Sequence, residues 1–221
     1  MLLLAADTTT ANGSVAVAED GDVVGEVRLG RQEGHSATLL PAIEFLLRSM
    51  GLAPAGVDVW AVAVGPGSFT GLRVGLSTIQ GLALASERRC VGVSALHAHA
   101  ARAVGTAPFL VAVTDAFRQE VYGQVFDADA RPVGEPGVGR IEALLERAPA
   151  GAGFVGDAAT RWRAEIELRC RDACFPRRSP FLAGEVARLA WREAAAGRSL
   201  APDALRPLYL REAQVRKPTT V

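Results

Sequence analysis

Residues 64–75 read VGPGSFTGLRVG, with four glycines in twelve positions. An apolar run over residues 59–64 precedes this stretch, and a run with helical character over residues 72–84 follows it. A strand, a glycine-containing loop and a helix in succession form the arrangement that binds phosphate groups in many nucleotide-binding proteins. The stretch therefore predicts an α/β fold and raises the question of whether its loop binds a nucleotide.

The glycine loop departs from two phosphate-binding motifs that begin in a similar way. The Walker motif requires a lysine after its last glycine, and the only lysine of the chain is Lys217. The dinucleotide motif G-x-G-x-x-G requires a glycine where Thr70 stands. The alternative is a tight strand-to-helix turn, in which Gly65 and Gly67 permit the sharp exit and Ser68 or Thr70 caps the helix.

The composition is typical of a folded globular protein. The chain has 221 residues, of which 49% are hydrophobic and 22% charged, enough for one large domain or two lobes. Its 24 basic and 24 acidic residues argue against a protein that binds nucleic acid alone. The apolar runs are too short to cross a bilayer, and residues 1–6 read as a buried strand rather than a signal peptide. We therefore expect a cytoplasmic protein with no membrane partner.

The three cysteines, Cys90, Cys170 and Cys174, are odd in number and scattered along the chain. This pattern predicts reduced thiols rather than a disulfide framework. Cys170 and Cys174 are four residues apart, but no second ligand pair accompanies them, so we expect no zinc site. The sequence assigns this pair no role.

The order of the predicted elements indicates two lobes. The first half is expected to contain strands over residues 2–6, 14–18, 23–29, 59–64 and 90–93, a hairpin turn over 19–22, and helices over 36–50, 71–86 and 94–104. After a joint at residues 105–108, a strand ending in Asp115 and a second strand over 120–126 repeat the beginning of the chain. A third strand is expected over 153–155, and helices are expected near 140–147, 157–168 and 180–196. We therefore predict an internal duplication, with lobes of residues 1–104 and 105–221, in which the segment 202–215 folds back on the first lobe.

The helices over 36–50 and 71–86 combine an apolar stripe with an unusual number of small residues. Small residues at helical spacing let another backbone approach closely, although each glycine lowers helix stability. One interpretation is that the two helices form a contact with another protein, and the alternative is that both cover their own sheet. The interpretation as a partner interface selects Leu39, Ile43, Leu46, Met50, Gly71, Gly75 and Gly81.

Segments along the whole chain resemble the TsaB family, formerly called YeaZ. The segments that carry the resemblance are LLAADTTT from residue 3, GHSATLLPAIEFLL from 34, GPGSFTGLRVGLSTIQGLALA from 65, GVSALHAHA from 92, TDAFRQEVYGQVF from 114 and RPLYLR from 206. A departure is Phe117, where the family more often has arginine. The resemblance implies a subunit of the bacterial machinery that makes N6-threonylcarbamoyladenosine at position 37 of tRNA.

The resemblance implies a duplicated actin/Hsp70-like fold (ASKHA, ribonuclease H-like), an α/β fold of two lobes with mixed sheets flanked by helices. In that superfamily the first strand and its turn bind nucleotide phosphate. The corresponding candidates here are Asp7, Thr8, Thr9, Thr10 and Asp115. Because the turn lacks the glycine that lets a phosphate approach the backbone, we infer a weakened or lost nucleotide site. We expect no tightly bound cofactor, and ATP or ADP only in an assembled complex.

Metal-ligand and nucleophile motifs are absent from the sequence. The related transferase TsaD holds a metal with an H-x-x-x-H pair, but here Leu39 stands four residues after His35. His97 and His99 are two residues apart, which on a helix points them in different directions. Neither H-E-x-x-H nor G-x-S-x-G occurs, and no nearby histidine supports Ser68 as a nucleophile. We therefore predict no catalytic residue, no metal site and no enzymatic activity of the chain on its own.

The function that the resemblance implies is that of a non-catalytic partner, which binds and activates a TsaD-type transferase. A TsaE-type ATPase belongs to the same assembly, tRNA is reached only through the complex, and the isolated chain forms a homodimer. A small-molecule kinase or ATPase of the same fold is the alternative, and a glycoprotease-like peptidase is a further one.

Overall fold

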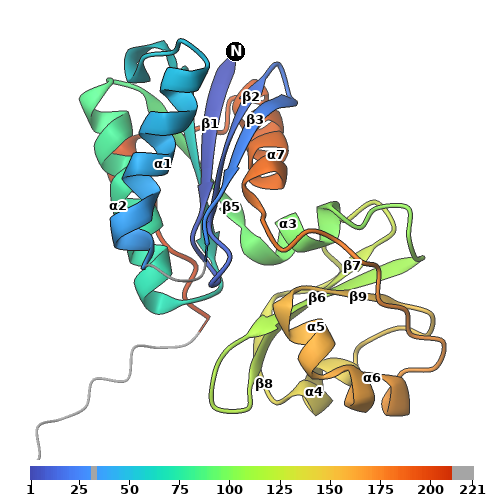
Figure 1. The fold of residues 1–221 in the computed structure, drawn as a ribbon. Helices are drawn as coiled ribbons and strands as arrows, with labels where there is room; N and C mark the ends of the chain where they lie inside the picture. Colours follow the sequence, from blue (N-terminus) through green and yellow to red (C-terminus); the bar gives the residue numbers. More distant parts are fainter. Residues whose placement is uncertain (31–33, 211–221) are drawn as a thin grey trace, which may run out of the picture.

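The structure is a computed structural model that describes residues 1–30 and 34–210. It consists of two α/β lobes, the first built on a five-stranded sheet of order β3-β2-β1-β4-β5 and the second on a four-stranded sheet of order β8-β7-β6-β9 (Figure 1). Helix α3 (Ala95–Ala101) lies where the two lobes meet. Two mixed sheets flanked by helices confirm the predicted fold class.

The first sheet has antiparallel strands on one side of β1 and parallel strands on the other. β1 (Leu2–Asp7) pairs antiparallel with β2 (Ser14–Glu19), which pairs antiparallel with β3 (Asp22–Arg28). β1 also pairs parallel with β4 (Val59–Gly65), and β4 with β5 (Arg89–Ser94). Side chains of β1 and β4 alternate between two cores, one on each face of the sheet. This double burial explains why both strands read as unbroken apolar runs.

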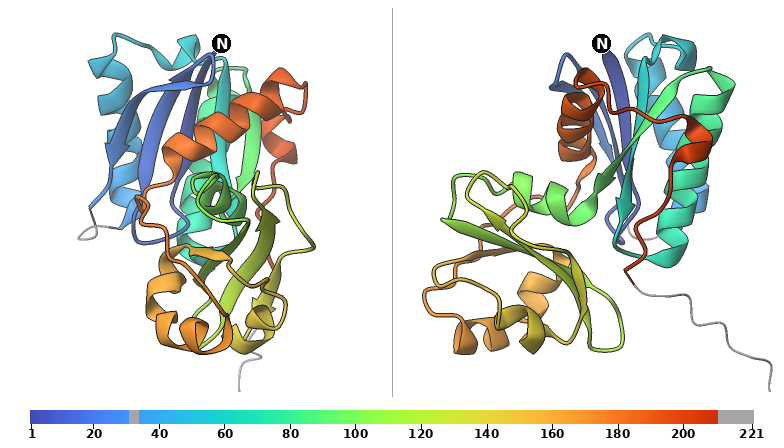
Figure 2. Two further views of the ribbon diagram at one scale, coloured as in Figure 1. Left: turned by 90° about the vertical axis from the view of Figure 1, so that its right-hand side faces the viewer. Right: turned by 180° about the vertical axis from the view of Figure 1, so that it is seen from behind.

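Helices cover both faces of the first sheet. α1 (His35–Ser49) and α2 (Phe69–Ala85) lie side by side on one face. The short 3₁₀ turn η1 (Pro54–Gly56) lies between α1 and β4 in the chain. α7 (Ala183–Ala195) packs on the opposite face (Figures 1 and 2). Within the described residues, no helix is both long and apolar enough to span a membrane.

The position of α7 corrects the predicted lobe boundary, which placed residues 105–221 in the second lobe, with only the segment 202–215 returning to the first. Leu182, Val186 and Ala190 are fully buried against the first sheet, next to β1 and β2. The chain therefore returns to the first lobe before α7 begins. Periodicity predicts the helix correctly but does not determine which of two sheets its apolar side covers.

The second lobe repeats the centre of the first in a smaller form. Its elements are β6 (Phe109–Asp115), β7 (Val121–Asp127), β8 (Gly137–Gly139), α4 (Ile141–Leu145), β9 (Gly153–Val155), α5 (Asp157–Arg161) and α6 (Arg163–Arg169). β6 pairs antiparallel with β7 and parallel with β9, as β1 does with β2 and β4. Both central strands end in an aspartate, Asp7 in β1 and Asp115 in β6.

The C-terminal part of the described chain runs along the first lobe. Leu200 and Cys90 exchange two backbone hydrogen bonds of 2.7 and 2.8 Å. The Gln80 amide donates to two carbonyl oxygens of the segment that contains η2 (Pro202–Ala204), at 2.7 and 3.2 Å. Residues 202–210 thus lie against α2 and the edge of the sheet, and residues 211–215 of the predicted return segment lie outside the described residues.

Candidate functional site

The glycine loop is a tight turn from β4 into α2 that packs on the turn after β1. Gly65 has a φ of +102°, which favours glycine, and a Cβ on Gly67 would lie 2.4 Å from the Thr9 carbonyl oxygen. Ser68 is the N-cap of α2, because its Oγ accepts a hydrogen bond of 3.2 Å from a backbone N–H of the first turn. Its own N–H donates to the Thr9 carbonyl at 2.7 Å. Thr70 lies within the helix and is exposed.

The candidate phosphate-binding turn after β1 uses several of its hydrogen-bonding groups within the chain, while the second carboxylate oxygen of Asp7 has no hydrogen-bond partner among the described residues. One carboxylate oxygen of Asp7 accepts the Thr9 N–H at 3.0 Å and the Thr9 hydroxyl at 2.7 Å. The Thr8 hydroxyl donates to the Gly71 carbonyl at 2.8 Å, and the Thr10 hydroxyl accepts an N–H two residues further on. A phosphate at this turn would have to displace these bonds. The site residues predicted there therefore form a turn packed against α2.

The two aspartates at the strand ends lie in different environments. Asp7 is fully buried, and this burial raises the pKa of its carboxyl group. Asp115 is partly exposed and forms an ion pair of 3.1 Å with Arg161. Its other carboxylate oxygen accepts the Phe117 N–H at 3.0 Å, which is the turn-capping role common for aspartate.

The apolar residues predicted as a partner interface are core residues. Leu39, Ile43 and Leu46 are 1%, 2% and 4% exposed and pack against the first sheet, and Met50 packs against the same core. They are covered by their own sheet, because the apolar stripe of α1 faces inward. The predicted partner interface is therefore wrong for Leu39, Ile43 and Leu46. The alternative, that the apolar stripe of α1 covers its own sheet, is correct.

The glycines of α2 have two different roles. A Cβ on Gly71 would lie 2.0 Å from the Thr8 carbonyl oxygen, and one on Gly75 would lie 2.3 Å from the Thr8 hydroxyl. Both glycines therefore let α2 approach the turn after β1, and they lie inside the lobe. No atom lies within 4 Å of a Cβ placed on Gly81, which is exposed. Of the three glycines in the predicted interface, Gly81 faces the outside.

The outer surface of α1 and α2 carries exposed apolar side chains that the sequence analysis did not select. Phe45 on α1 is 65% exposed and Leu84 on α2 is 71% exposed. We define the α1–α2 face as Leu40, Phe45, Ser77, Gly81 and Leu84, all exposed. Helical periodicity could have identified these residues, because they lie one or two positions away from the residues of the inward-facing stripe.

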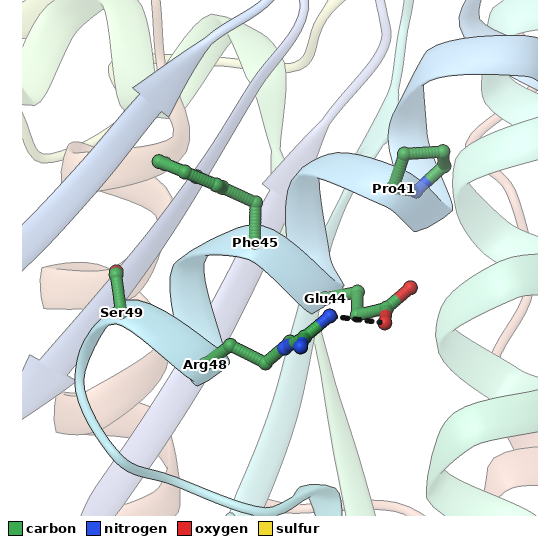
Figure 3. Close-up of a pocket in the computed structure, with 5 residues that line it drawn as sticks. All are labelled: Pro41, Glu44, Phe45, Arg48 and Ser49. Atoms are coloured by element: carbon green, nitrogen blue, oxygen red, sulfur yellow. Dashed lines mark hydrogen bonds and ion pairs between the residues drawn. The ribbon is translucent and has the colours of Figure 1, made fainter.

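A shallow hollow of about 460 Å³ lies on the α1 part of this face, lined by Pro41, Glu44, Phe45, Arg48 and Ser49. The Phe45 ring projects from one side of α1, and the Glu44–Arg48 ion pair of 3.4 Å lies on another side of the same helix (Figure 3). An apolar ring bordered by a mutually neutralised ion pair suits contact with another protein better than contact with an anion.

Each histidine has a structural setting of its own. The His35 Nε2 lies 2.7 Å from the Thr10 carbonyl oxygen, and the His97 ring stacks on Phe126. His99 is buried, and burial lowers its pKa to about 4, so it is neutral at pH 7. The described residues contain no group of three His, Cys, Asp or Glu side chains arranged to hold a metal ion.

The three cysteines are free thiols. Cys90 and Cys170 are buried, and burial raises the pKa of the Cys90 thiol to about 11. A raised pKa keeps a thiol protonated, so Cys90 is an inert core residue rather than a nucleophile.

Comparison with known proteins identifies the family of the chain. The curated protein "tRNA threonylcarbamoyladenosine biosynthesis protein TsaB" of Escherichia coli is 32% identical over 220 residues, which cover 96% of this chain and 95% of that one. The chain belongs to the TsaB family. A solved structure of YeaZ from Pseudomonas aeruginosa, 29% identical, superimposes with a TM-score of 0.80 over 95% of this chain and 99% of that chain. The resemblance read from the sequence motifs is confirmed.

Two further similarities relate TsaB to a wider group. The family model described as "TsaD: tRNA N6-adenosine threonylcarbamoyltransferase" matches residues 23–155, a range that includes α1 and α2. The activator of 2-hydroxyisocaproyl-CoA dehydratase from Clostridium difficile is 11% identical, covers 95% of this chain and 100% of that one, and superimposes with a TM-score of 0.54. At that identity it shows a likeness of fold alone.

Alanine substitutions at Gly75 and Gly81 are expected to change stability in opposite directions. Gly75→Ala places a Cβ against the Thr8 hydroxyl, and the resulting shift should cost about 1–3 kcal/mol of unfolding free energy. The new Cβ of Gly81→Ala has no neighbour within 4 Å, so this variant should gain up to about 1 kcal/mol of unfolding free energy through helix propensity. Urea unfolding of both variants measures the difference, and equal stabilities would contradict the close approach of α2 to Thr8.

His99 should make stability depend on pH. Its pKa is about 4 in the folded chain against 6.5 for the free side chain, so the unfolded chain binds a proton first as the pH falls. The stabilisation is therefore present above pH 6.5 and is lost between pH 6.5 and 4, amounting to about 3 kcal/mol in total. Unfolding free energies of the wild type and of His99→Phe across this range measure the effect. Parallel pH profiles would contradict it.

Proposed function

We propose that the chain is a non-catalytic subunit of the machinery that makes N6-threonylcarbamoyladenosine in tRNA, and that it binds and activates a TsaD-type transferase. Membership of the TsaB family supports the pathway, because the Escherichia coli relative is named for the biosynthesis of this nucleoside. The observation that carries the partner role is the α1–α2 face. Phe45 and Leu84, both largely exposed, are large apolar side chains on adjacent helices of one lobe.

The shape of the α1–α2 face suits a pair of helices from another molecule. Ser77 and Gly81 are small and exposed, so the outside of α2 is low there, and Leu84 projects from the same helix one turn further on. A low strip beside apolar ridges is the geometry into which the ridge of a second helix packs. The partner therefore contributes helices rather than a strand or an extended peptide.

A transferase of the TsaD family is the partner that this geometry favours. Its family model matches residues 23–155 of this chain, so a transferase carries counterparts of α1 and α2. Two equivalent helix pairs related by an approximate two-fold axis form a four-helix contact, and two copies of this chain form the symmetric version. The homodimer is then the state of the isolated protein, and the transferase replaces one copy. A stable contact of this kind buries about 1,200 Å² or more.

The remaining partners join through the transferase. In this proposal the TsaE-type ATPase and tRNA bind the assembled cytoplasmic complex, and ATP or ADP is held there rather than by this chain alone. The turn after β1 supports this division, because the Thr8 hydroxyl is bonded to Gly71 and the Thr9 hydroxyl and N–H are bonded to Asp7. The same observation weighs against a kinase or ATPase of this fold, which needs that turn for phosphate.

Substitutions on the α1–α2 face should abolish the contact with the transferase and leave the fold intact. Leu84→Glu introduces a charge into the contact, and Gly81→Leu fills the low strip while suiting a helix. We expect each to weaken binding of purified transferase by a factor of about ten or more, measured by calorimetry. The matched control is Leu168→Glu, since Leu168 on α6 is 84% exposed and lies in the second lobe.

Binding of both variants with wild-type affinity, or equal weakening by Leu168→Glu, would contradict the α1–α2 face as the transferase site. Sedimentation of the isolated chain adds an independent readout. The wild type and Leu168→Glu should be dimers at micromolar concentration, and Leu84→Glu should be a monomer with unchanged circular dichroism.

The isolated chain should neither hydrolyse ATP nor cleave peptides. Addition of the chain to transferase, ATPase, tRNA and the threonylcarbamoyl donor should raise formation of the modified nucleoside, measured by mass spectrometry of digested tRNA. Hydrolysis that persists in the chain purified to homogeneity, and that scales with its concentration, would contradict a non-catalytic role.

A further inference from the structure

The first turn of α2 and the C-terminal end of the described chain form an exposed aromatic cluster. Phe69 is 48% exposed and Tyr209 is 46% exposed, and their ring centroids lie 5.9 Å apart. The Arg73 guanidinium lies over the Phe69 ring, 3.9 Å from its centre, and its Nε donates to the Tyr209 hydroxyl oxygen at 3.5 Å. We call Phe69, Arg73 and Tyr209 the stacking cluster.

The segment that follows α7 brings Tyr209 to this position. It runs along α2 (Figure 2), where Leu205 is buried in the core that α2 shares with the first sheet. The Leu208 N–H donates to the Val64 carbonyl oxygen at 2.8 Å, directly before the glycine loop. Tyr209 is therefore held next to α2 by backbone and core contacts, although 136 positions separate it from Arg73 in the sequence.

The cluster leaves an arginine charge available for another molecule. Arg73 is exposed, and within the described part of the chain it contacts the two rings and no carboxylate. Its terminal nitrogens remain as donors, because only Nε is bonded to Tyr209. Two exposed rings and a stacked guanidinium form a platform on which a further planar group can stack.

The surrounding sequence adds positive charge to this end of the chain. Arg206 is exposed three residues before Tyr209. Residues 211–221 follow directly and contain three basic residues and one acidic residue, namely Arg211, Arg216, Lys217 and Glu212. The whole chain has equal numbers of basic and acidic residues, so this excess is local. Aromatic rings interspersed with basic residues are typical of surfaces that bind single-stranded nucleic acid, because rings stack on bases and cations contact phosphates.

The stacking cluster continues the α1–α2 face along α2. Phe69, Arg73, Ser77 and Gly81 are spaced four residues apart and therefore lie along one side of the helix. A transferase bound to the α1–α2 face would lie next to the cluster, so one RNA molecule can contact both proteins. A protein contact of the cluster itself is the alternative that the experiment has to separate.

We propose that the stacking cluster binds an unpaired base of an RNA loop. The Tyr209 and Phe69 rings stack on the base, and Arg73 donates to the adjacent phosphate. This inference rests on the proposed function, because it gives the tRNA of that assembly a contact on this chain. A paired base does not fit, since its neighbours in the duplex cover both of its faces. A single small contact of this kind agrees with tRNA binding to the assembled complex rather than to the chain alone.

Fluorescence anisotropy with the complex of this chain and the transferase tests the proposal. The probes are a labelled RNA hairpin with an unpaired loop and a labelled RNA duplex of the same base composition. Tyr209→Leu and Phe69→Leu should each weaken hairpin binding about ten-fold, because each removes a ring and keeps an apolar side chain. Both variants should leave duplex binding unchanged.

A charge variant provides a second readout that a structural role would not change. Arg73→Gln should weaken hairpin binding and lower the slope of log Kd against log salt concentration by about one. The matched controls lie in the second lobe. They are Phe117→Leu, at a phenylalanine that is 60% exposed, and Arg171→Gln, at an arginine whose side chain is 89% exposed. Both controls should bind the hairpin like the wild type.

Calorimetry with the transferase separates an RNA contact from a protein contact. Tyr209→Leu should bind the transferase with wild-type affinity, because Tyr209 belongs to neither α1 nor α2. Weaker transferase binding by this variant would assign the cluster to the protein contact and overturn the proposal. Equal hairpin affinity of the wild type and Tyr209→Leu, or equal weakening by the controls, would overturn it as well.

The two measurements also separate this inference from the proposed function. If the wild-type chain and the transferase form no complex, the proposed function fails and this inference fails with it. If the complex forms and its RNA affinity does not depend on the stacking cluster, this inference alone is refuted.

Discussion

The close approach of α2 to the turn after β1 is the contact on which the rest of the structure depends. Gly71 and Gly75 have no side chain where Thr8 lies, and the Thr8 hydroxyl donates to the Gly71 carbonyl across 63 positions of sequence. This contact holds α2 against β4 and leaves α1 beside it on the same face. It also occupies the turn that would otherwise bind phosphate, so one packing arrangement has consequences for both the partner surface and the nucleotide site.

The outside of α1 and α2 differs in chemistry from the cleft between the lobes. The outside of α1 and α2 is apolar, with the Glu44–Arg48 pair neutralised at its border, and suits a protein partner. The cleft between the lobes is lined by four arginines and Asp157. The chain crosses between the lobes at α3 and again before α7, and both crossings supply arginines to the cleft.

Local signals in the sequence predicted most of the elements and some of their details. The hairpin turn over 19–22 forms with positive φ at Asp20 and Gly21, and Ser68 caps α2 as one of the two candidates. The predictions that failed concern features that depend on contacts with residues far away in the sequence. The apolar stripe of α1 faces its own sheet, the helix predicted near 157–168 is split at Trp162, and α7 packs on the first lobe.

The sequence by itself determined the α/β class, the duplicated start of each lobe, the strand-to-helix loop and the family, because turn chemistry, periodicity and motifs are properties of adjacent residues. Only the tertiary structure decided which glycines of α2 face inward, since Gly75 and Gly81 differ solely in whether Thr8 lies opposite. The same holds for the basic cleft. Its arginines come from three separate segments, and their convergence depends on how the lobes pack, a property that no single stretch of sequence encodes.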